Sequence, residues 1–347
     1  MLKAAAAEVA AKQATSRLIG AALSMNGIFA VNKPPGISCT GLLDYFKRNI
    51  GRGAAAVPFE EHYEQEKELR NSGKKIRRRR YSLNLRVGHG GTLDVEAAGV
   101  MIIGVNKGCK LLSEYLNCGK SYLANARFGV ATDSCDAEGV ITNLSDPHAV
   151  TGEMLNAVIP KFVGSIQQMP PIYSAIKVDG KRLYDYARGG HEIPAGIKKR
   201  QVNVSSIKML FFENPHSKEQ LGRRVVLPVE YSDYFDNGRY RWSVDPGTMK
   251  VGNVMTPFAN NPNLPFFQLL VQSGSGVYIR SLIDDMGSEL GCSATMISLL
   301  RTSQGSLRLN HDTINVEDLA YVDRVIGAIR HVDNVLQHNI ESQQTKI

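Results

Sequence analysis

The segment Gly88–Gly99, which reads GHGGTLDVEAAG, constrains this chain more than any other part of its sequence. Its glycines allow positive φ angles and let other parts of the chain approach closely. Its one aspartate, Asp94, and its one imidazole, His89, stand just before an apolar run, Val100–Val105, that predicts a buried strand. A glycine-framed loop before a core strand is a frequent place for an active site. A tight turn whose aspartate only caps the backbone fits the same residues.

Composition narrows the class of protein. The 347 residues are 43% hydrophobic, which suffices for one large core or two smaller ones. The net charge of +8 favours a polyanionic partner. The five cysteines form no CxxC pair, so we expect neither a disulfide framework nor a zinc site, and we expect a reducing compartment. No apolar run approaches the ~20 residues that span a bilayer, so we expect no membrane partner.

Two segments carry unusual charge. Residues 1–24 are rich in alanine and basic, which fits an organelle-targeting peptide or a loosely ordered extension equally well. An insertion is predicted near 51–86, and its part from residue 58 begins acidic and ends in a basic run. That run consists of Lys74, Lys75, Arg77, Arg78, Arg79 and Arg80. It fits an RNA-backbone contact, a nuclear-import signal or a solvated loop, and its position just before the glycine loop favours the RNA contact.

Periodicity and turn residues predict the remaining elements. Strands are expected at 27–31, 100–105, 120–129, 172–178, 202–212, 267–272 and 294–300. Helices are expected at 38–50, 107–117, 151–162 and 277–290, with helical periodicity again in the tail. Residues 213–264 are polar and rich in Asn, Pro and Gly, which predicts a second, less ordered insertion.

Several standard sites are excluded by spacing. The chain has no GxxxxGK[ST] loop, no HExxH metal motif and no GxSxG nucleophile elbow. A lone aspartate can act as nucleophile or base if an arginine keeps it ionised, and Arg280 is a candidate for that arginine. Tyr122 and Tyr278 can stack on an unstacked base, although core packing explains a strand tyrosine as well.

Asp94 lies in a segment, GHGGTLDVEAAGVMIIG, that resembles the catalytic segment of the TruB family of pseudouridine synthases. The likeness continues in the same order along the chain, through GIFAVNKPPG before that segment and KSYLANARFG, TDSCDAEG, QMPPIYSAIKVDGKRLYDYAR, SGSGVYIRSLIDDMGSELG and LLRTSQG after it. The likeness is nearest to the eukaryotic, fungal branch that acts on position 55 of tRNA and that has a basic insertion before the glycine loop as well.

The resemblance implies an α/β (α+β) pseudouridine synthase fold with a mixed, largely antiparallel central sheet flanked by helices and loops. We expect a catalytic domain over 25–310, an N-terminal extension over 1–24 and a helical tail over 311–347. Only 46 residues follow Arg301, so we expect no C-terminal PUA module.

The resemblance also assigns roles by position. Asp94 is expected to be the catalytic aspartate, Arg280 its ion-pair partner, and Tyr122 the residue that stacks on the flipped base and can move the C5 proton. The expected substrate-binding residues are His89, Gly90, Lys120, Tyr278 and Leu299, with the six basic residues of 74–80. Val95 stands where the family usually has proline, which would pre-set the loop backbone.

The implied activity is isomerisation of the T-loop uridine of tRNA to pseudouridine, without cofactor or metal. The expected partner is the T-arm of tRNA, and we expect a monomer with no obligate protein partner. The expected location is the nucleus, the mitochondrion or both, with the cytoplasm as a further location. Action on messenger or ribosomal RNA, or a role as a tRNA-folding chaperone, are the alternatives.

Overall fold

The structure, a computed structural model, describes residues 20–72, 85–188, 192, 194, 197–225, 249–251, 254–256 and 261–344. By its internal contacts the chain divides into two compact units, one of residues 1–118 with 301–347 and one of residues 119–300. No helix in the described ranges is both long and apolar enough to cross a membrane.

The first unit is built on β3 (Ala98–Val105), an uninterrupted apolar strand whose residues are all buried. β3 pairs antiparallel with β1 (Gly27–Lys33) and with β2 (Val87–His89), and β17 (Thr313–Ile314) adds to β1 in parallel. The other elements of this unit are α2 (Cys39–Asn49), η1 (Gly53–Ala55), α3 (Phe59–Asn71), η2 (Asn106–Lys110), α4 (Leu112–Asn117), β16 (Leu307–Arg308), η4 (Val316–Ala320) and α9 (Val322–Gln344).

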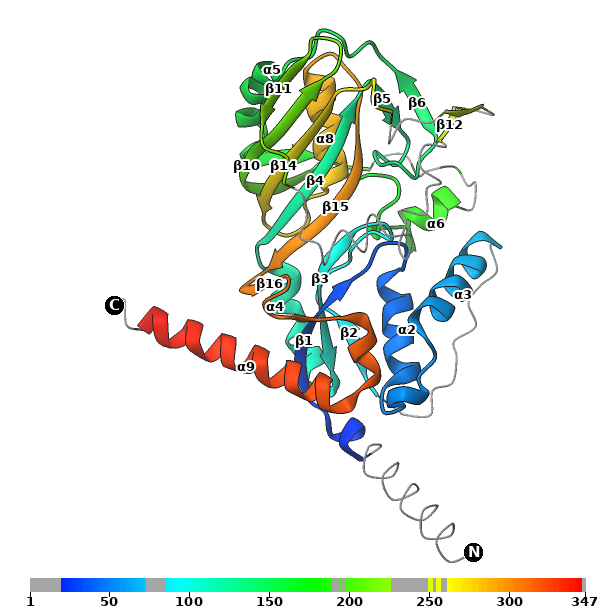
Figure 1. The fold of residues 1–347 in the computed structure, drawn as a ribbon, viewed down its shortest axis with the longest axis vertical. Coiled ribbons are helices and arrows are strands. Elements are labelled where there is room, and N and C mark those ends of the chain that lie inside the picture. Colours follow the sequence, from blue (N-terminus) through cyan, green and yellow to red (C-terminus); the bar gives the residue numbers. More distant parts are fainter. Residues whose placement is uncertain are drawn as a thin grey trace, which may run out of the picture. The chain divides into compact units, whose positions relative to one another are not determined.

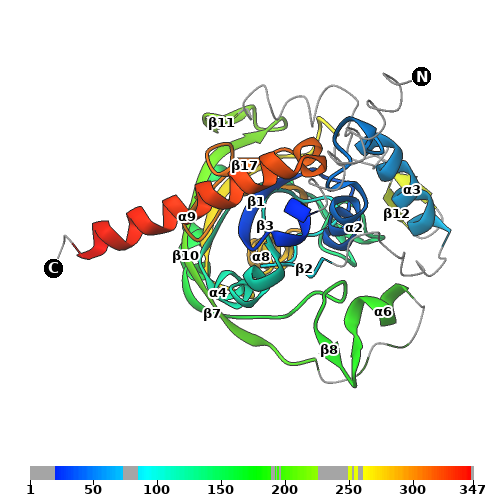
Figure 2. The same ribbon diagram turned by 90° about the horizontal axis from the view of Figure 1, so that it is seen from below.

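A helix cap fixes the start of α2, and a buried apolar stripe fixes α9. Ser38 caps α2, since its Oγ accepts a hydrogen bond from Gly41 N at 2.9 Å. Val325 and Val332 of α9 are fully buried, and the helix lies alongside β17 and β1 (Figure 2). Burial of this apolar stripe fixes α9 against the sheet.

The second unit contains a sheet with the order β11-β10-β14-β4-β15 (Figure 1). β7 pairs with β10. A smaller sheet has the order β13-β12-β6-β5, and β8 pairs with β9. The strands are β4 (Lys120–Phe128), β5 (Val130–Thr132), β6 (Ile141–Leu144), β7 (Gly164–Gln168), β8 (Lys177–Val178), β9 (Lys181–Arg182), β10 (Arg200–Asn214), β11 (Glu219–Gly222), β12 (Met249–Val251), β13 (Val254–Thr256), β14 (Phe266–Ser273) and β15 (Ala294–Gln304), which ends in the first unit. The helices are α5 (Gly152–Val158), η3 (Ile159–Phe162), α6 (Leu183–Arg188) and α8 (Ile279–Glu289).

The expected fold class is confirmed, because helices accompany a mixed sheet whose ladders are mostly antiparallel, with β1–β17 and β12–β6 parallel. Most expected elements are present within a few residues of the predicted ends. The strand expected at 172–178 is wrong, since only β8 forms there. The carbonyls of Ser174 and Ile176 accept hydrogen bonds from Tyr184 N and Leu183 N, at the start of α6, so they are not available to a neighbouring strand.

The two expected insertions contain more regular structure than their charge and polarity predict. Residues 59–71 form α3, which packs on α2 through the edge-to-face rings of Tyr45 and Phe59, 5.1 Å apart. The polar segment from 213 begins with a hairpin, in which β10 turns back into β11. The basic residues 74–80, residues 1–19 and residues 226–248 lie outside the described residues.

Asp284 on α8 gives a stability prediction. Burial, helped by the neighbouring charge of Asp285, raises the pKa of Asp284 to about 6. A raised carboxyl pKa means that the folded state holds the proton more tightly than the unfolded chain, so stability falls as pH rises from about 4 to 6. Asp284→Asn removes this cost. It should raise the free energy of unfolding at pH 7 by about 1 kcal/mol, which allows for partial solvent screening.

Urea unfolding at pH 7 and pH 4 checks this expectation, because the gain should vanish at pH 4. Asp285→Asn is the matched variant, with a smaller gain expected, since Lys199 opposes the burial that raises the Asp285 pKa. An equal gain for Asp284→Asn at both pH values would contradict the assignment.

Candidate active site

The loop that carries Asp94 joins β2 to β3 in the first unit. Gly90 N donates to Ile102 O at 2.8 Å, which is the last ladder bond before the loop leaves the sheet. Beyond that point the loop carbonyls have no strand partner, so other groups must satisfy them. His89 lies half-buried on β2 opposite Ile103, and Asp94 is half-buried in the loop itself.

Lys33, the last residue of β1, binds backbone carbonyls near the C-terminal end of this loop. Its side chain is fully buried, and Nζ donates to Pro34 O, Val95 O and Ala97 O at 2.8, 2.9 and 2.6 Å. Burial lowers the pKa of Lys33 to about 8, although the nearby thiol of Cys39 and the carboxylates of Glu96 and Asp94 oppose that shift. The ammonium is therefore still protonated at neutral pH, with all three N–H groups available to donate.

Arg301 and Gln304, both fully buried, bind backbone carbonyls at the N-terminal end of the loop. The Arg301 guanidinium donates to Val100 O at 2.7 Å, to Gly91 O at 3.3 Å and to Thr92 O at 3.4 Å. Gln304 Nε2 donates to Gly90 O at 2.5 Å and to Tyr115 O at 2.9 Å. These side chains thus hold the first three carbonyls of the loop.

The start of α2 holds the middle of the loop. Cys39 Sγ lies 3.2 Å from Leu93 N and 3.4 Å from Leu93 O. Gly36 N donates to Val95 O at 2.8 Å. Both bonds to Val95 use its carbonyl oxygen, which proline also has. The departure from the family's proline therefore removes none of these contacts.

The residues that hold this loop were not singled out as site residues from the sequence. Lys33 and Arg301 stand in two of the segments that carry the family resemblance, NKPPG and LLRTSQG. Their motif positions were thus the available signal, but local spacing does not indicate that a cation will be buried.

The second unit contains the other expected site residues. Tyr122 is 8% exposed on β4, opposite Val271 of β14, and Lys120 is buried two residues earlier on the same face. Asn125 Nδ2 donates to Ser298 Oγ at 2.7 Å, which places these two side chains on one face of the sheet. Because side chains alternate along strands, Tyr122 and Leu299 share the opposite face. The structure therefore places Lys120, Tyr122 and Leu299 on the same face of the sheet.

Arg280 is held at the start of α8. Its side chain is 3% exposed, and its guanidinium donates to Ser134 O at 2.6 Å and to Tyr173 O at 3.1 Å. Nε lies 3.4 Å from Asp136 Oδ2. Tyr278, the residue before α8, is half-buried. Asp94 belongs to the first unit and Arg280 to the second, so their expected ion pair stays a prediction.

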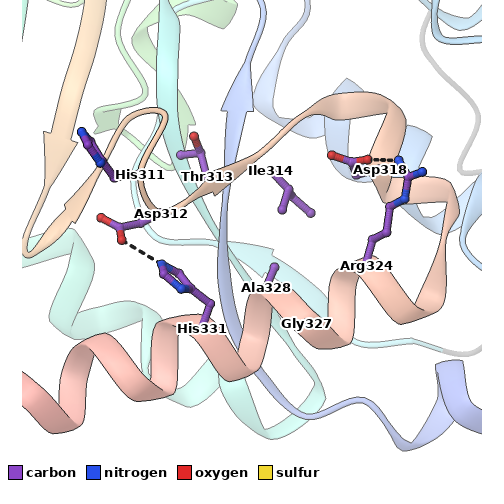
Figure 3. A pocket seen from close by; sticks show the side chains of 9 residues that line it. All are labelled: His311, Asp312, Thr313, Ile314, Asp318, Arg324, Gly327, Ala328 and His331. Carbon is purple, nitrogen blue, oxygen red and sulfur yellow. Dashed lines mark hydrogen bonds and ion pairs between the residues drawn. The ribbon is translucent and has the colours of Figure 1, made fainter.

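A groove of about 360 Å³ lies elsewhere in the first unit, between β17, η4 and α9 (Figure 3). Within it His331 Nε2 lies 2.9 Å from Asp312 Oδ1, and Arg324 binds Asp318. None of the expected site residues lines it. The described ranges contain no group of three or more His, Cys, Asp or Glu side chains suited to a metal ion.

Gly99 gives a prediction about the frame of the loop. Its φ is +104°, and a Cβ there would overlap the carbonyl oxygen of Arg301. Gly164 has a similar φ of +93° with open space around it. Gly164→Ala should therefore cost only the backbone strain, about 1–3 kcal/mol. Gly99→Ala should cost at least ~2 kcal/mol more, because backbone must also move. Urea unfolding of both variants checks this, and equal losses would contradict it.

The chain is similar to known proteins of one family. Residues 78–230 match the family model described as TruB family pseudouridylate synthase, N-terminal domain. The chain is 30% identical to the human pseudouridylate synthase TRUB1, over 93% of this chain and 73% of that protein. It is 31% identical to tRNA pseudouridine synthase 4 of Saccharomyces cerevisiae, over 84% of this chain and 79% of the yeast protein. The chain therefore belongs to the TruB family of pseudouridine synthases.

Proposed function

We propose that this protein converts the uridine at position 55, in the T-loop of tRNA, to pseudouridine. The observation that carries the proposal is the loop of Asp94, whose backbone carbonyls are bound by buried side chains from three separate parts of the chain. Relatives similar over most of their length are named tRNA pseudouridine synthases, including the proteins of Saccharomyces cerevisiae and Schizosaccharomyces pombe. These names support tRNA as the substrate.

The reaction is an isomerisation, so it needs no oxidant, reductant or group donor. The bond from C1′ to N1 breaks, the ring turns, a bond from C1′ to C5 forms, and the C5 proton leaves while N1 gains one. We assign the carboxylate of Asp94 to the first step, whether it attacks C1′, attacks the ring or removes a sugar proton. Arg280 keeps Asp94 ionised, and Tyr122, Tyr278 and Leu299 hold the extruded base.

The remaining proposals concern the contact with RNA, the oligomeric state and the location in the cell. The basic run 74–80 contacts RNA phosphates, and its replacement by serines should flatten the salt dependence of tRNA binding.

The protein acts as a monomer, which sedimentation of the free and tRNA-bound chain tests. It works in the nucleus, the mitochondrion or both. Residues 1–24 are the mitochondrial address, and the chain started at Met25 should be absent from mitochondria while staying active.

The direct test uses an unmodified tRNA transcript and reads pseudouridine at position 55. Wild-type protein should modify it, whereas Asp94→Asn should bind the tRNA about as well and form no pseudouridine, because affinity comes from many backbone contacts. Pseudouridine formed by Asp94→Asn above background would move the chemistry to another residue. If the wild-type protein leaves uridine 55 unmodified but makes the tRNA fold faster, that result would favour the chaperone alternative.

Tyr122 allows a second test, which separates stacking from proton transfer. Tyr122→Phe keeps the aromatic face and removes the phenol oxygen, whereas Tyr122→Leu removes both. If the hydroxyl takes the C5 proton, Tyr122→Phe should bind tRNA normally and turn over about 10²–10⁴-fold more slowly. Single-turnover rates with labelled uridine measure this. A fully active Tyr122→Phe would refute proton transfer and leave Tyr122 as a stacking platform.

A further inference from the structure

Gln168 bonds the backbone of Tyr278 from both sides. It ends β7, and its side chain is 2% exposed. Its Oε1 accepts a hydrogen bond from Tyr278 N at 2.8 Å, and its Nε2 donates one to Tyr278 O at 2.9 Å. The carboxamide thus makes the two backbone hydrogen bonds that a neighbouring strand makes to a residue in a sheet. Only a group that both accepts and donates can make both bonds.

Tyr278 needs such a partner because of its place in the chain. It is the N-cap residue of α8, with φ −101° and ψ 108°, and no side chain caps the helix from this position. Its carbonyl accepts the first helical bond, from Leu282 N at 3.0 Å, but its N–H points outside the helix. The turn before it is anchored at the other end, where Gly274 N donates to Asn203 O at 2.8 Å.

The same clamp fixes the start of α8, which carries Arg280. The Arg280 guanidinium is buried and contacts Ser134 O, Tyr173 O and Asp136. A rotation of the Tyr278 backbone would therefore turn the Tyr278 ring and strain the contacts of Arg280 together. Gln168 itself need not touch the substrate.

We propose that Gln168 is a positioning residue for the isomerisation. Its carboxamide fixes the backbone of Tyr278, and thereby the direction in which Tyr278 meets the flipped uridine and the position of Arg280, which keeps Asp94 ionised. This inference rests on the proposed function, since it assigns the orientation of residues in that site.

Two substitutions test the clamp, Gln168→Glu and Gln168→Met. An ionised carboxylate can only accept, so it would repel Tyr278 O, whereas a protonated carboxyl both accepts and donates as the amide does. Gln168→Glu should therefore be slow at pH 8 and recover towards wild type near pH 5.5. Gln168→Met has a similar length and no strong donor or acceptor, so it should stay slow at every pH.

The measurement is the single-turnover rate on unmodified tRNA between pH 5.5 and 8.5, divided by the wild-type rate at the same pH, together with the tRNA dissociation constant. We expect a loss of up to about 10²-fold for Gln168→Glu at pH 8, which is the scale of a small misplacement of reacting groups. The dissociation constant should stay near the wild-type value, because the phosphate contacts are untouched.

Gln268 offers a matched control in the same unit. It is 1% exposed, and it also bonds one backbone residue from both sides, with Oε1 accepting from Val225 N at 2.9 Å and Nε2 donating to Val225 O at 3.2 Å. Its Nε2 donates to Asn125 Oδ1 at 2.9 Å as well. It pairs opposite Asn125, three residues along β4 from Tyr122, and so it lies on the other face of the sheet from Tyr122. Gln268→Glu should lose stability with the same pH dependence and keep its rate.

The control separates positioning from folding. A Gln168→Glu rate that falls at pH 8 and recovers at pH 5.5, while Gln268→Glu stays near wild type, supports the proposal. Wild-type rates for Gln168→Glu at pH 8, or equal losses in both glutamate variants that follow their melting temperatures, would overturn it. An inactive wild-type protein would instead defeat the proposed function.

Discussion

Two buried cations, Lys33 and Arg301, bind the carbonyl oxygens of the loop that carries Asp94. A loop outside a β-ladder leaves its backbone unsatisfied, and burial makes each unsatisfied carbonyl costly. Charged donors offset that cost more strongly than neutral ones do. Burial lowers the pKa of Lys33 only to about 8, so the cation survives at neutral pH. The position of Asp94, and hence the proposed chemistry, depends on these bonds.

Local patterns in the sequence predict most of the fold. The helix after Ser38 and the strand before Asn106 appear with ends close to those expected, because caps and apolar runs are local signals. The strand expected at 172–178 and the helix α3 show the limit of that approach. In the first case the carbonyls of the segment bond to the start of α6, a contact that its β-branched residues do not reveal. In the second, α3 is stabilised by packing on α2, which the charge pattern of the segment does not reveal.

The sequence predicts some residues of the candidate site and not others. Family resemblance provides Asp94, Tyr122 and Arg280 by position, whereas the residues that hold them are not evident from it. Gln168 contacts a residue 110 positions away, and Arg301 contacts residues about 210 positions away. Periodicity reports only neighbours within a helix or strand, so such contacts are invisible to it. A lysine or arginine in a sequence is also normally assigned to the surface.

Hydrogen–deuterium exchange of the free protein tests the central claim, that buried side chains hold the loop of Asp94 in place before substrate binds. The amides of Gly90, Leu93 and Ala97 all have acceptors in the structure. Peptides covering residues 90–97 should therefore exchange slowly, nearly as slowly as those of β3, and Arg301→Met should accelerate that exchange while leaving α8 unchanged. Exchange of this loop in the wild-type protein as fast as in an unstructured peptide would contradict the account.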